Sequence, residues 1–98
     1  MLTCCEKVRR FASGEFTGDE LRFDAILRNL EVMGEAAKRV PDEVRQRMPS
    51  VDWRGLAGLR DVLIHSYSGV DGETIVDIVR RKVPPLEAEL RRYLDATA

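Results

Sequence analysis

Residues 60–67, RDVLIHSY, place the only histidine of the chain between an Arg-Asp pair and a tyrosine. At about 100° per residue, Asp61 and His65 share one helix face, whereas Arg60 and His65 lie about 140° apart around the axis. Arg60 and His65 therefore do not easily hold one small group from a single straight helix. Three alternatives remain: a distorted last turn, a ligand that spans the helix, or an interface with a second chain.

The position of His65 suits either proton transfer or a structural role. We expect it in the final turn of a helix, where free carbonyl groups favour a positive charge, and one turn after the carboxylate of Asp61. Both effects favour the protonated imidazole. The structural alternative, which residue types alone favour, is a histidine that caps the helix end and pairs with Asp61.

These residues are compatible with few kinds of catalytic site. No Ser or Cys can be assigned to a triad, the chain has no Gly-rich phosphate loop, and one histidine with scattered carboxylates is weak evidence for a metal site. RNA cleavage without a metal ion is still possible. It needs a general base, a general acid and a cation that stabilises the charged phosphorane. Arg60 can be that cation. Since one chain offers one imidazole, a two-imidazole mechanism requires two chains around a two-fold axis.

Length and composition predict one domain over residues 1–98 with a single core. With 44% hydrophobic and 34% charged residues, the chain is typical of a soluble globular protein. Its uncharged stretches fall short of the about 18 residues of a membrane span, so no membrane partner is expected.

Residues 1–10 lack the features of a secretory signal, which predicts a cytoplasmic location. The net charge of −1 means that any contact with nucleic acid needs a local basic cluster.

The hydrophobic pattern is helical nearly throughout, without the alternation typical of strands. N-caps are predicted at Thr17, which opens a T-x-x-E capping box, at Ser50 and at Asp71. Pro84-Pro85 should kink or split the last helix. The pattern predicts an all-α antiparallel bundle of four or five helices, over about residues 2–13, 18–40, 42–48, 51–66 and 72–94.

Three ordered stretches resemble one known family. Arg60-x4-His65-x-Tyr67 matches the R-x4-H-x-Y signature of HEPN-domain proteins, specifically of the HepT-like toxins of bacterial and archaeal toxin-antitoxin pairs. Residues 28–40, RNLEVMGEAAKRV, resemble the family stretch R-N-L-x-x-I-G-E-A-A-K. Residues 51–71, VDWRGLAGLRDVLIHSYSGVD, resemble W-x-x-I-x-x-x-R-[ND]-x-x-x-H-x-Y-x-x-V-D. With the closing IVRRKVPPLEAEL, the likeness covers nearly everything from about residue 15.

The resemblance implies a HEPN-like bundle that forms a homodimer, with paired motifs meeting in a cleft. It also implies metal-independent endoribonuclease activity without a cofactor, in which Arg60 holds the phosphate, His65 transfers protons and Asp61 orients the site. Asn29 and Glu35 belong to the family stretch. Either side chain would line the cleft or, as we favour, form hydrogen bonds between helices.

The same resemblance implies a partner and a modification. Tyr67 matches the tyrosine to which a cognate minimal nucleotidyltransferase (MNT) antitoxin transfers AMP in this family. The added phosphate would lie beside Arg60 and His65 and compete with RNA for the cation. The implied role is the toxin of a type II/VII-like toxin-antitoxin system in a prokaryotic cytoplasm. The competing hypothesis is a non-catalytic helical module that binds a nucleotidyltransferase partner.

Several residues carry further expectations. The first helix is shorter than in the family, which a truncated or late start would explain. We expect stability or dimer packing to suffer. Asp61 stands where the family has Asn or another polar residue, and it adds a negative charge to the site. Gly34 costs roughly 1 kcal/mol in a helix interior relative to Ala, which predicts a close helix crossing. Trp53 is expected in the core, and the basic run 80–82 on solvated helix surface.

Overall fold

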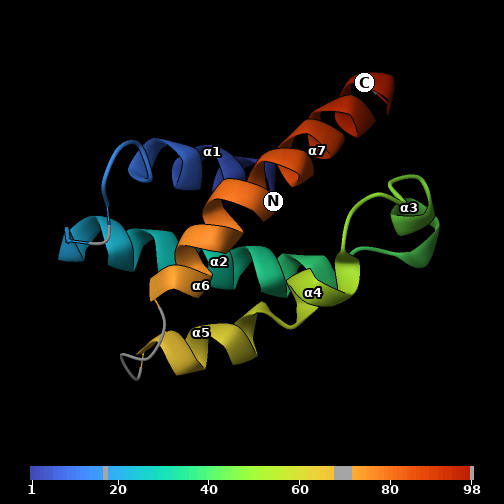
Figure 1. The fold of residues 1–98 in the computed structure, drawn as a ribbon. Helices are drawn as coiled ribbons and strands as arrows, with labels where there is room; N and C mark the ends of the chain where they lie inside the picture. The colour runs from blue at the N-terminus through green and yellow to red at the C-terminus, as the bar shows by residue number, and fades with distance from the viewer. Residues whose placement is uncertain (17, 68–71, 98) are drawn as a thin grey trace.

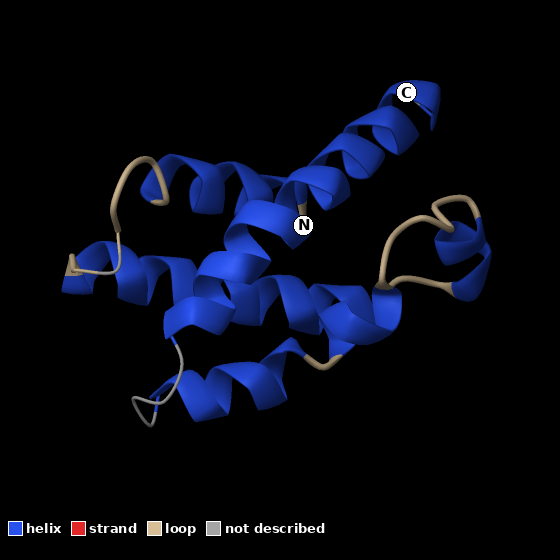
Figure 2. Cartoon of the chain, viewed as in Figure 1, coloured by secondary structure: helices blue, strands red, loops and turns tan. Residues whose placement is uncertain are grey.

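The structure, a computed structural model, describes residues 1–16, 18–67 and 72–97, except for the side chains of residues 65–67. In these residues the chain forms helices and no strand (Figure 2). The all-α prediction is therefore confirmed. The elements are α1 Leu2–Phe11, α2 Glu20–Lys38, α3 Asp42–Gln46, α4 Trp53–Ala57, α5 Leu59–Tyr67, α6 Gly72–Asp77, the π-helical turn η1 Ile78–Lys82 and α7 Val83–Thr97.

The long helix α2 is the centre of the arrangement. α1 runs antiparallel to α2, and α5 lies along a different side of it (Figure 1). α6, η1 and α7 follow one another as a long rod that crosses the other helices and packs against α1. The predicted antiparallel bundle is present, and its middle helix supports both α1 and α5.

Aspartates begin two of the helices, which corrects the predicted caps. Asp19 precedes α2, and its Oδ1 accepts a hydrogen bond from the backbone N–H of Arg22 at 3.2 Å. Asp52 does the same for α4, accepting from the N–H of Gly55 at 3.0 Å. Aspartate caps helices as well as Ser or Thr does, so the predictions at Thr17 and Ser50 were wrong. The predicted cap at residue 71 lies outside the described residues.

Gly58 divides the helix that was predicted to run unbroken from residue 51. Its N–H donates to the carbonyl of Arg54 at 3.1 Å, and its own carbonyl accepts from the N–H of Asp61 at 3.1 Å. Glycine has the greatest backbone freedom and a low helix propensity, which favours a break at this position. α5 therefore starts as a separate short helix, one residue before Arg60.

The disruption predicted at Pro84-Pro85 takes the form of a widened turn before the prolines. The N–H of Val83 donates to the carbonyl of Ile78, five residues earlier, as in a π-helix. Both prolines then occupy the first turn of α7, where their missing N–H groups cost little. The rod continues past them.

The core joins all the long elements. Trp53, predicted in the core, is half-buried against it, and its Nε1 donates to the carbonyl of Met48 at 3.1 Å. The short first helix contributes two fully buried side chains. The buried apolar residues are Cys5, Val8, Phe16, Ile26, Leu27, Leu30, Met33, Ala37, Met48, Leu59, Leu63, Ile75, Val79, Val83, Leu86 and Leu90.

Candidate active site

Helix α5, which carries the Arg-x4-His motif, has a buried face and an open face. Leu59 and Leu63 are 4% and 1% exposed and pack into the core. Arg60, Asp61 and Ile64 lie on the open face. Burial of two leucines one turn apart fixes how the helix is rotated about its axis. This rotation directs Arg60 toward solvent.

The position of α5 against α2 depends on a glycine. A Cβ atom on Gly34 would lie 3.2 Å from the Cβ of Leu59, closer than most real contacts of this kind. The absence of a side chain at Gly34 lets the start of α5 approach α2 closely. The predicted close helix crossing is confirmed.

Arg60 is exposed, and its guanidinium has no hydrogen bond or ion pair to any residue that the structure describes. Asp61 is exposed next to it, and its carboxylate likewise has no such partner in the described part of the chain. An unpaired guanidinium on a fixed helix offers five N–H donors in a fork that matches phosphate. The arrangement provides an anion-binding group that no internal carboxylate neutralises.

His65 and Tyr67 lie on the last turn of α5, but their side chains are outside the described residues. The backbone is α-helical from Leu59 through Tyr67. Of the three alternatives for Arg60 and His65, the distorted last turn is thus not observed. A ligand that spans the helix and an interface with a second chain both fit an undistorted α5.

Asn29 and Glu35 form their observed bonds within α2. The half-buried Asn29 donates from Nδ2 to the carbonyl of Ala25 at 2.8 Å. The exposed Glu35 accepts from Nζ of Lys38 at 3.2 Å. The expectation that they bridge helices was wrong, because each finds a partner one turn away on its own helix. Their role in a cleft stays a prediction.

Ile64 is a feature that the sequence reasoning missed. Its side chain is 55% exposed and lies one turn after Arg60 on the open face of α5. The hydrophobic pattern alone does not distinguish it from its buried neighbour Leu63. The signal that separates them is the four-residue spacing of Leu59 and Leu63, which leaves Ile64 about 100° away from the buried face.

The described residues contain no group of three or more His, Cys, Asp and Glu side chains that could hold a metal ion. None of their helices has both the length and the apolar character needed to cross a membrane.

Comparison with known proteins gives a family match over most of the chain. The family model described as "Ribonuclease HepT-like" matches residues 1–93. "Putative RNase TTE0752" of Caldanaerobacter subterraneus subsp. tengcongensis is 36% identical over 89 residues, which cover 91% of this chain and 80% of the relative. No solved structure shows a significant match.

Two archaeal relatives are similar as well. "Putative RNase MJ0127" of Methanocaldococcus jannaschii is 49% identical over 70 residues, which cover 71% of this chain and 58% of the relative. "Probable ribonuclease HepT" of Thermococcus cleftensis is 33% identical over 87 residues, which cover 89% of this chain and 79% of the relative.

Proposed function

This chain belongs to the HepT-like ribonuclease family, and we propose that it is a metal-independent endoribonuclease whose active site combines Arg60 and His65 of two chains. The relatives named as ribonucleases support RNA as the substrate. The observation that carries the proposal is Arg60 itself, which is exposed and unpaired among the described residues. Its helix is anchored through the opposite face by Leu59 and Leu63.

The reaction we propose is attack by the 2′-hydroxyl on the adjacent phosphorus. His65 of one chain takes the hydroxyl proton as general base, and the 2′-oxygen forms the new bond to phosphorus. Arg60 donates hydrogen bonds to the phosphoryl oxygens of the phosphorane as negative charge develops. The bond to the 5′-oxygen then breaks, and a protonated His65 of the second chain supplies the proton. The products are a 2′,3′-cyclic phosphate and a free 5′-hydroxyl.

Ile64 supports the homodimer on which this mechanism depends. Its exposed side chain shares the open face of α5 with Arg60. Fully burying an exposed isoleucine contributes about 1.5–3 kcal/mol, and roughly half of this remains to be gained at Ile64, which is 55% exposed. A second copy of α5 packed on this face would cover Ile64 and bring two motifs together around a two-fold axis. Asp61, Asn29 and Glu35 are the supporting residues that we assign to this cleft.

We further propose that the protein is the toxin of a type II/VII-like toxin-antitoxin system. Its partner would be an MNT-type nucleotidyltransferase antitoxin that transfers AMP to Tyr67. Tyr67 lies two residues after His65 on α5, so an added phosphate would approach the motif and occupy Arg60. Mass spectrometry of Tyr67 after co-expression with the enzyme tests this step. An unmodified tyrosine in an inactive complex would contradict it and indicate steric blocking.

The decisive experiment measures RNA cleavage in EDTA. Purified wild-type protein should cleave single-stranded RNA and leave 2′,3′-cyclic phosphate ends. Arg60→Ala and His65→Ala should each lose at least about 100-fold in rate, as expected when a charge-stabilising or proton-transfer group is removed. Arg54→Ala is the matched control, because Arg54 is an exposed arginine on neighbouring α4. Wild-type rates in both motif variants would overturn the proposal.

The exposed face of α5 also favours the alternative of a non-catalytic module. A cation beside an uncovered isoleucine is a combination that a partner protein can bind. On this alternative, a broad panel of RNAs stays intact while the chain forms a stable complex with a co-expressed nucleotidyltransferase. Loss of that complex in Ile64→Glu, without any cleavage by the wild type, would support the module.

A further inference from the structure

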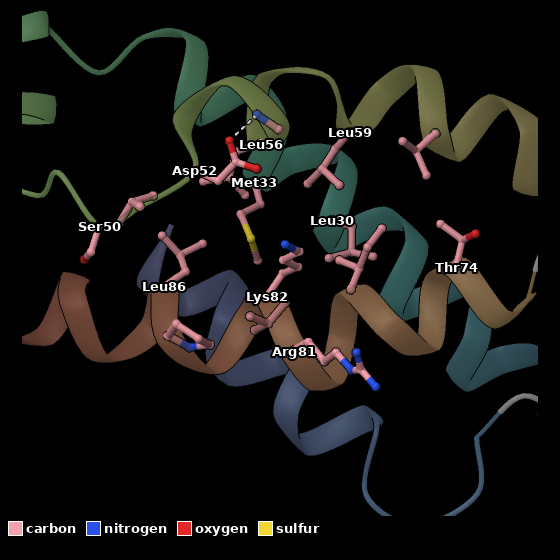
Figure 3. A pocket seen from close by; sticks show the side chains of 16 residues that line it. Leu30, Met33, Ser50, Asp52, Leu56, Leu59, Thr74, Arg81, Lys82 and Leu86 are labelled. Atoms are coloured by element: carbon pink, nitrogen blue, oxygen red, sulfur yellow. Dashed lines mark hydrogen bonds between the residues drawn. The ribbon is translucent and has the colours of Figure 1, made fainter.

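A groove of about 410 Å³ lies on the inner side of α5, opposite the face that carries Arg60. Figure 3 shows α4 and α5 on one side of it, η1 and α7 on the other, and α2 behind. Its walls are mainly apolar. Side chains from all of these elements contribute, among them Leu30, Met33, Leu56, Leu59, Ile78 and Leu86.

The groove follows from the packing of the helices. α4 and α5 pack against α2, whereas α7 packs against α1, so the two layers leave a space between them. Glu89 of α7 lies near one end of this space. Its carboxylate accepts a hydrogen bond from Arg92 at 2.5 Å, and Arg92, with a smaller effect of Ser50, lowers its pKa. Ser50 lines the groove before α4.

Lys82 supplies a positive charge to this apolar space. In Figure 3 its nitrogen points from η1 toward the α4 side of the groove, and its side chain stays exposed to solvent. No residue in the described part of the chain forms an ion pair or hydrogen bond with Lys82. The other charged groups of the lining have partners of their own. Arg81 pairs with Asp77 at 3.1 Å, and Asp52 accepts from the N–H of Gly55 at 3.0 Å.

We propose that this groove binds an amphiphilic monoanion, a carboxylate with an aliphatic or aromatic tail. The volume lies in the range of about 300–1,000 Å³ that is typical of small-molecule sites, and apolar walls with one placed charge are typical of their lining. The tail contacts the half-buried side chains of Leu56, Val62 and Ile78, while the carboxylate pairs with the ammonium of Lys82.

Binding at this site affects the helix that carries the Arg-x4-His motif. Leu59 and Val62 line the groove from α5, and Arg60 lies between them on the outer face. A bound tail fills the space beneath α5 and adds contacts that the free protein lacks. Because the ligand binds the folded chain, it also raises the melting temperature. This inference does not depend on the ribonuclease activity proposed above.

Titration calorimetry with decanoate, kept below the concentration at which it forms micelles, tests the site. We expect saturable binding of one decanoate per chain and a higher melting temperature. Lys82→Gln should weaken decanoate binding about fivefold, the value of a partly exposed ion pair. Lys7→Gln, which removes an exposed lysine on α1, is the matched control and should bind as the wild type does. Decanol, which lacks the charge, should bind wild type and Lys82→Gln equally.

Two variants that fill the groove complete the test. Val62→Phe and Ile78→Phe each enlarge a half-buried lining side chain on opposite walls, and both should abolish decanoate binding. The near-ultraviolet circular dichroism of Trp53 verifies that each variant keeps its tertiary structure. The proposal fails if the wild type does not bind decanoate, if Lys82→Gln binds it as tightly, or if a folded Phe variant retains full affinity.

Discussion

Gly34 of α2 faces the backbone carbonyl of Leu56 so closely that no side chain fits between them. A Cβ atom at Gly34 would lie 2.9 Å from that oxygen. Leu56 is in α4, and α5 begins three residues later, so the contact holds α4 and the start of α5 near α2. The glycine lowers the helix propensity of α2, but it permits the approach by which Leu59 and Leu63 become buried.

Gly34→Ala should destabilise the protein although it improves helix propensity. The added methyl group would force the backbone of Leu56 away, and such overpacking costs about 1–3 kcal/mol. Above the low end of this range, the cost is larger than the roughly 1 kcal/mol gained in propensity; the contact is with backbone, which cannot rotate away as a side chain can. Urea denaturation of wild type and variant measures the difference in the free energy of unfolding.

Gly18→Ala is the matched control for this substitution. A Cβ atom at Gly18 would meet nothing within 4 Å, so the free energy of unfolding should change by less than about 0.5 kcal/mol. If Gly34→Ala raises the stability by the full propensity difference, the close contact with Leu56 does not limit the packing.

Arg22 should stabilise the connection between α1 and α2. Its Nε donates to the carbonyl of Phe11 at 2.8 Å, and its terminal nitrogens donate to the carbonyls of Ser13 and Glu15. Arg22→Lys retains the charge but not the planar fork that reaches three carbonyl groups. We expect the free energy of unfolding to fall by about 1–3 kcal/mol, measured by urea denaturation.

Arg28→Lys serves as the comparison for Arg22→Lys. Arg28 is an exposed arginine of the same helix, and its bond to Glu31 is long, at 3.5 Å. Exposed pairs of this kind contribute about 0–1 kcal/mol. Equal effects of the two substitutions would mean that the three carbonyl contacts of Arg22 add nothing to stability.

The sequence predicts those features of the fold that depend on side-chain periodicity. The apolar side chains spaced three and four residues apart on α2, from Ile26 to Ala37, are buried, as the helical pattern indicates. Gly34 permits the expected close crossing. The predicted N-cap at Thr17 failed because Asp19, two residues later, is an equally good cap. The helix predicted to run unbroken from residue 51 is divided at Gly58. Glycine has a low helix propensity, which the spacing of apolar residues does not reveal.

The candidate site is predictable only where it depends on local sequence. The motif identifies Arg60, and the spacing of Leu59 and Leu63 accounts for its exposure. The groove beneath α5 has no such local signal. It is lined by residues from position 30 to position 86, which come together only when the helices pack. The basic run 80–82 is exposed, as predicted, and only the packing shows that Lys82 also lines an apolar space.

Cys5 should make the stability fall with rising pH above about 9. Burial, with a smaller contribution from the negative charge of Glu87, raises the pKa of its thiol from 9.0 to about 12. Above pH 9 the unfolded chain loses the thiol proton while the folded protein keeps it, so the unfolded state is increasingly favoured up to about pH 12. Urea denaturation between pH 8 and pH 10.5, run on wild type and Cys5→Ala, measures this dependence.

The difference between the two proteins isolates the thiol from other groups that titrate at high pH. Cys5→Ala should be less stable at pH 8, because it leaves a cavity, but its stability should decline less as the pH rises. Identical slopes for wild type and Cys5→Ala would show that Cys5 ionises at its ordinary pKa in the folded protein.

Ile64→Glu should convert the proposed dimer into folded monomers. The side chain is 55% exposed in the single chain, so the substitution removes little core packing and should leave the fold intact. In a two-fold interface, however, each copy of α5 would face a carboxylate of the other, in a position that excludes water. Burying unpaired like charges is unfavourable. Sedimentation velocity should therefore show a dimer for the wild type and a monomer for Ile64→Glu.

Leu94→Glu provides the matched comparison for Ile64→Glu, since Leu94 is 46% exposed but lies near the end of α7. It should remain a dimer and retain the cleavage rate of the wild type. Because the proposed site needs residues of two chains, monomeric Ile64→Glu should lose cleavage even though Arg60 and His65 are unchanged. Full activity in a verified monomer would mean that one α5 performs the reaction alone, and that the substrate spans the helix from Arg60 to His65.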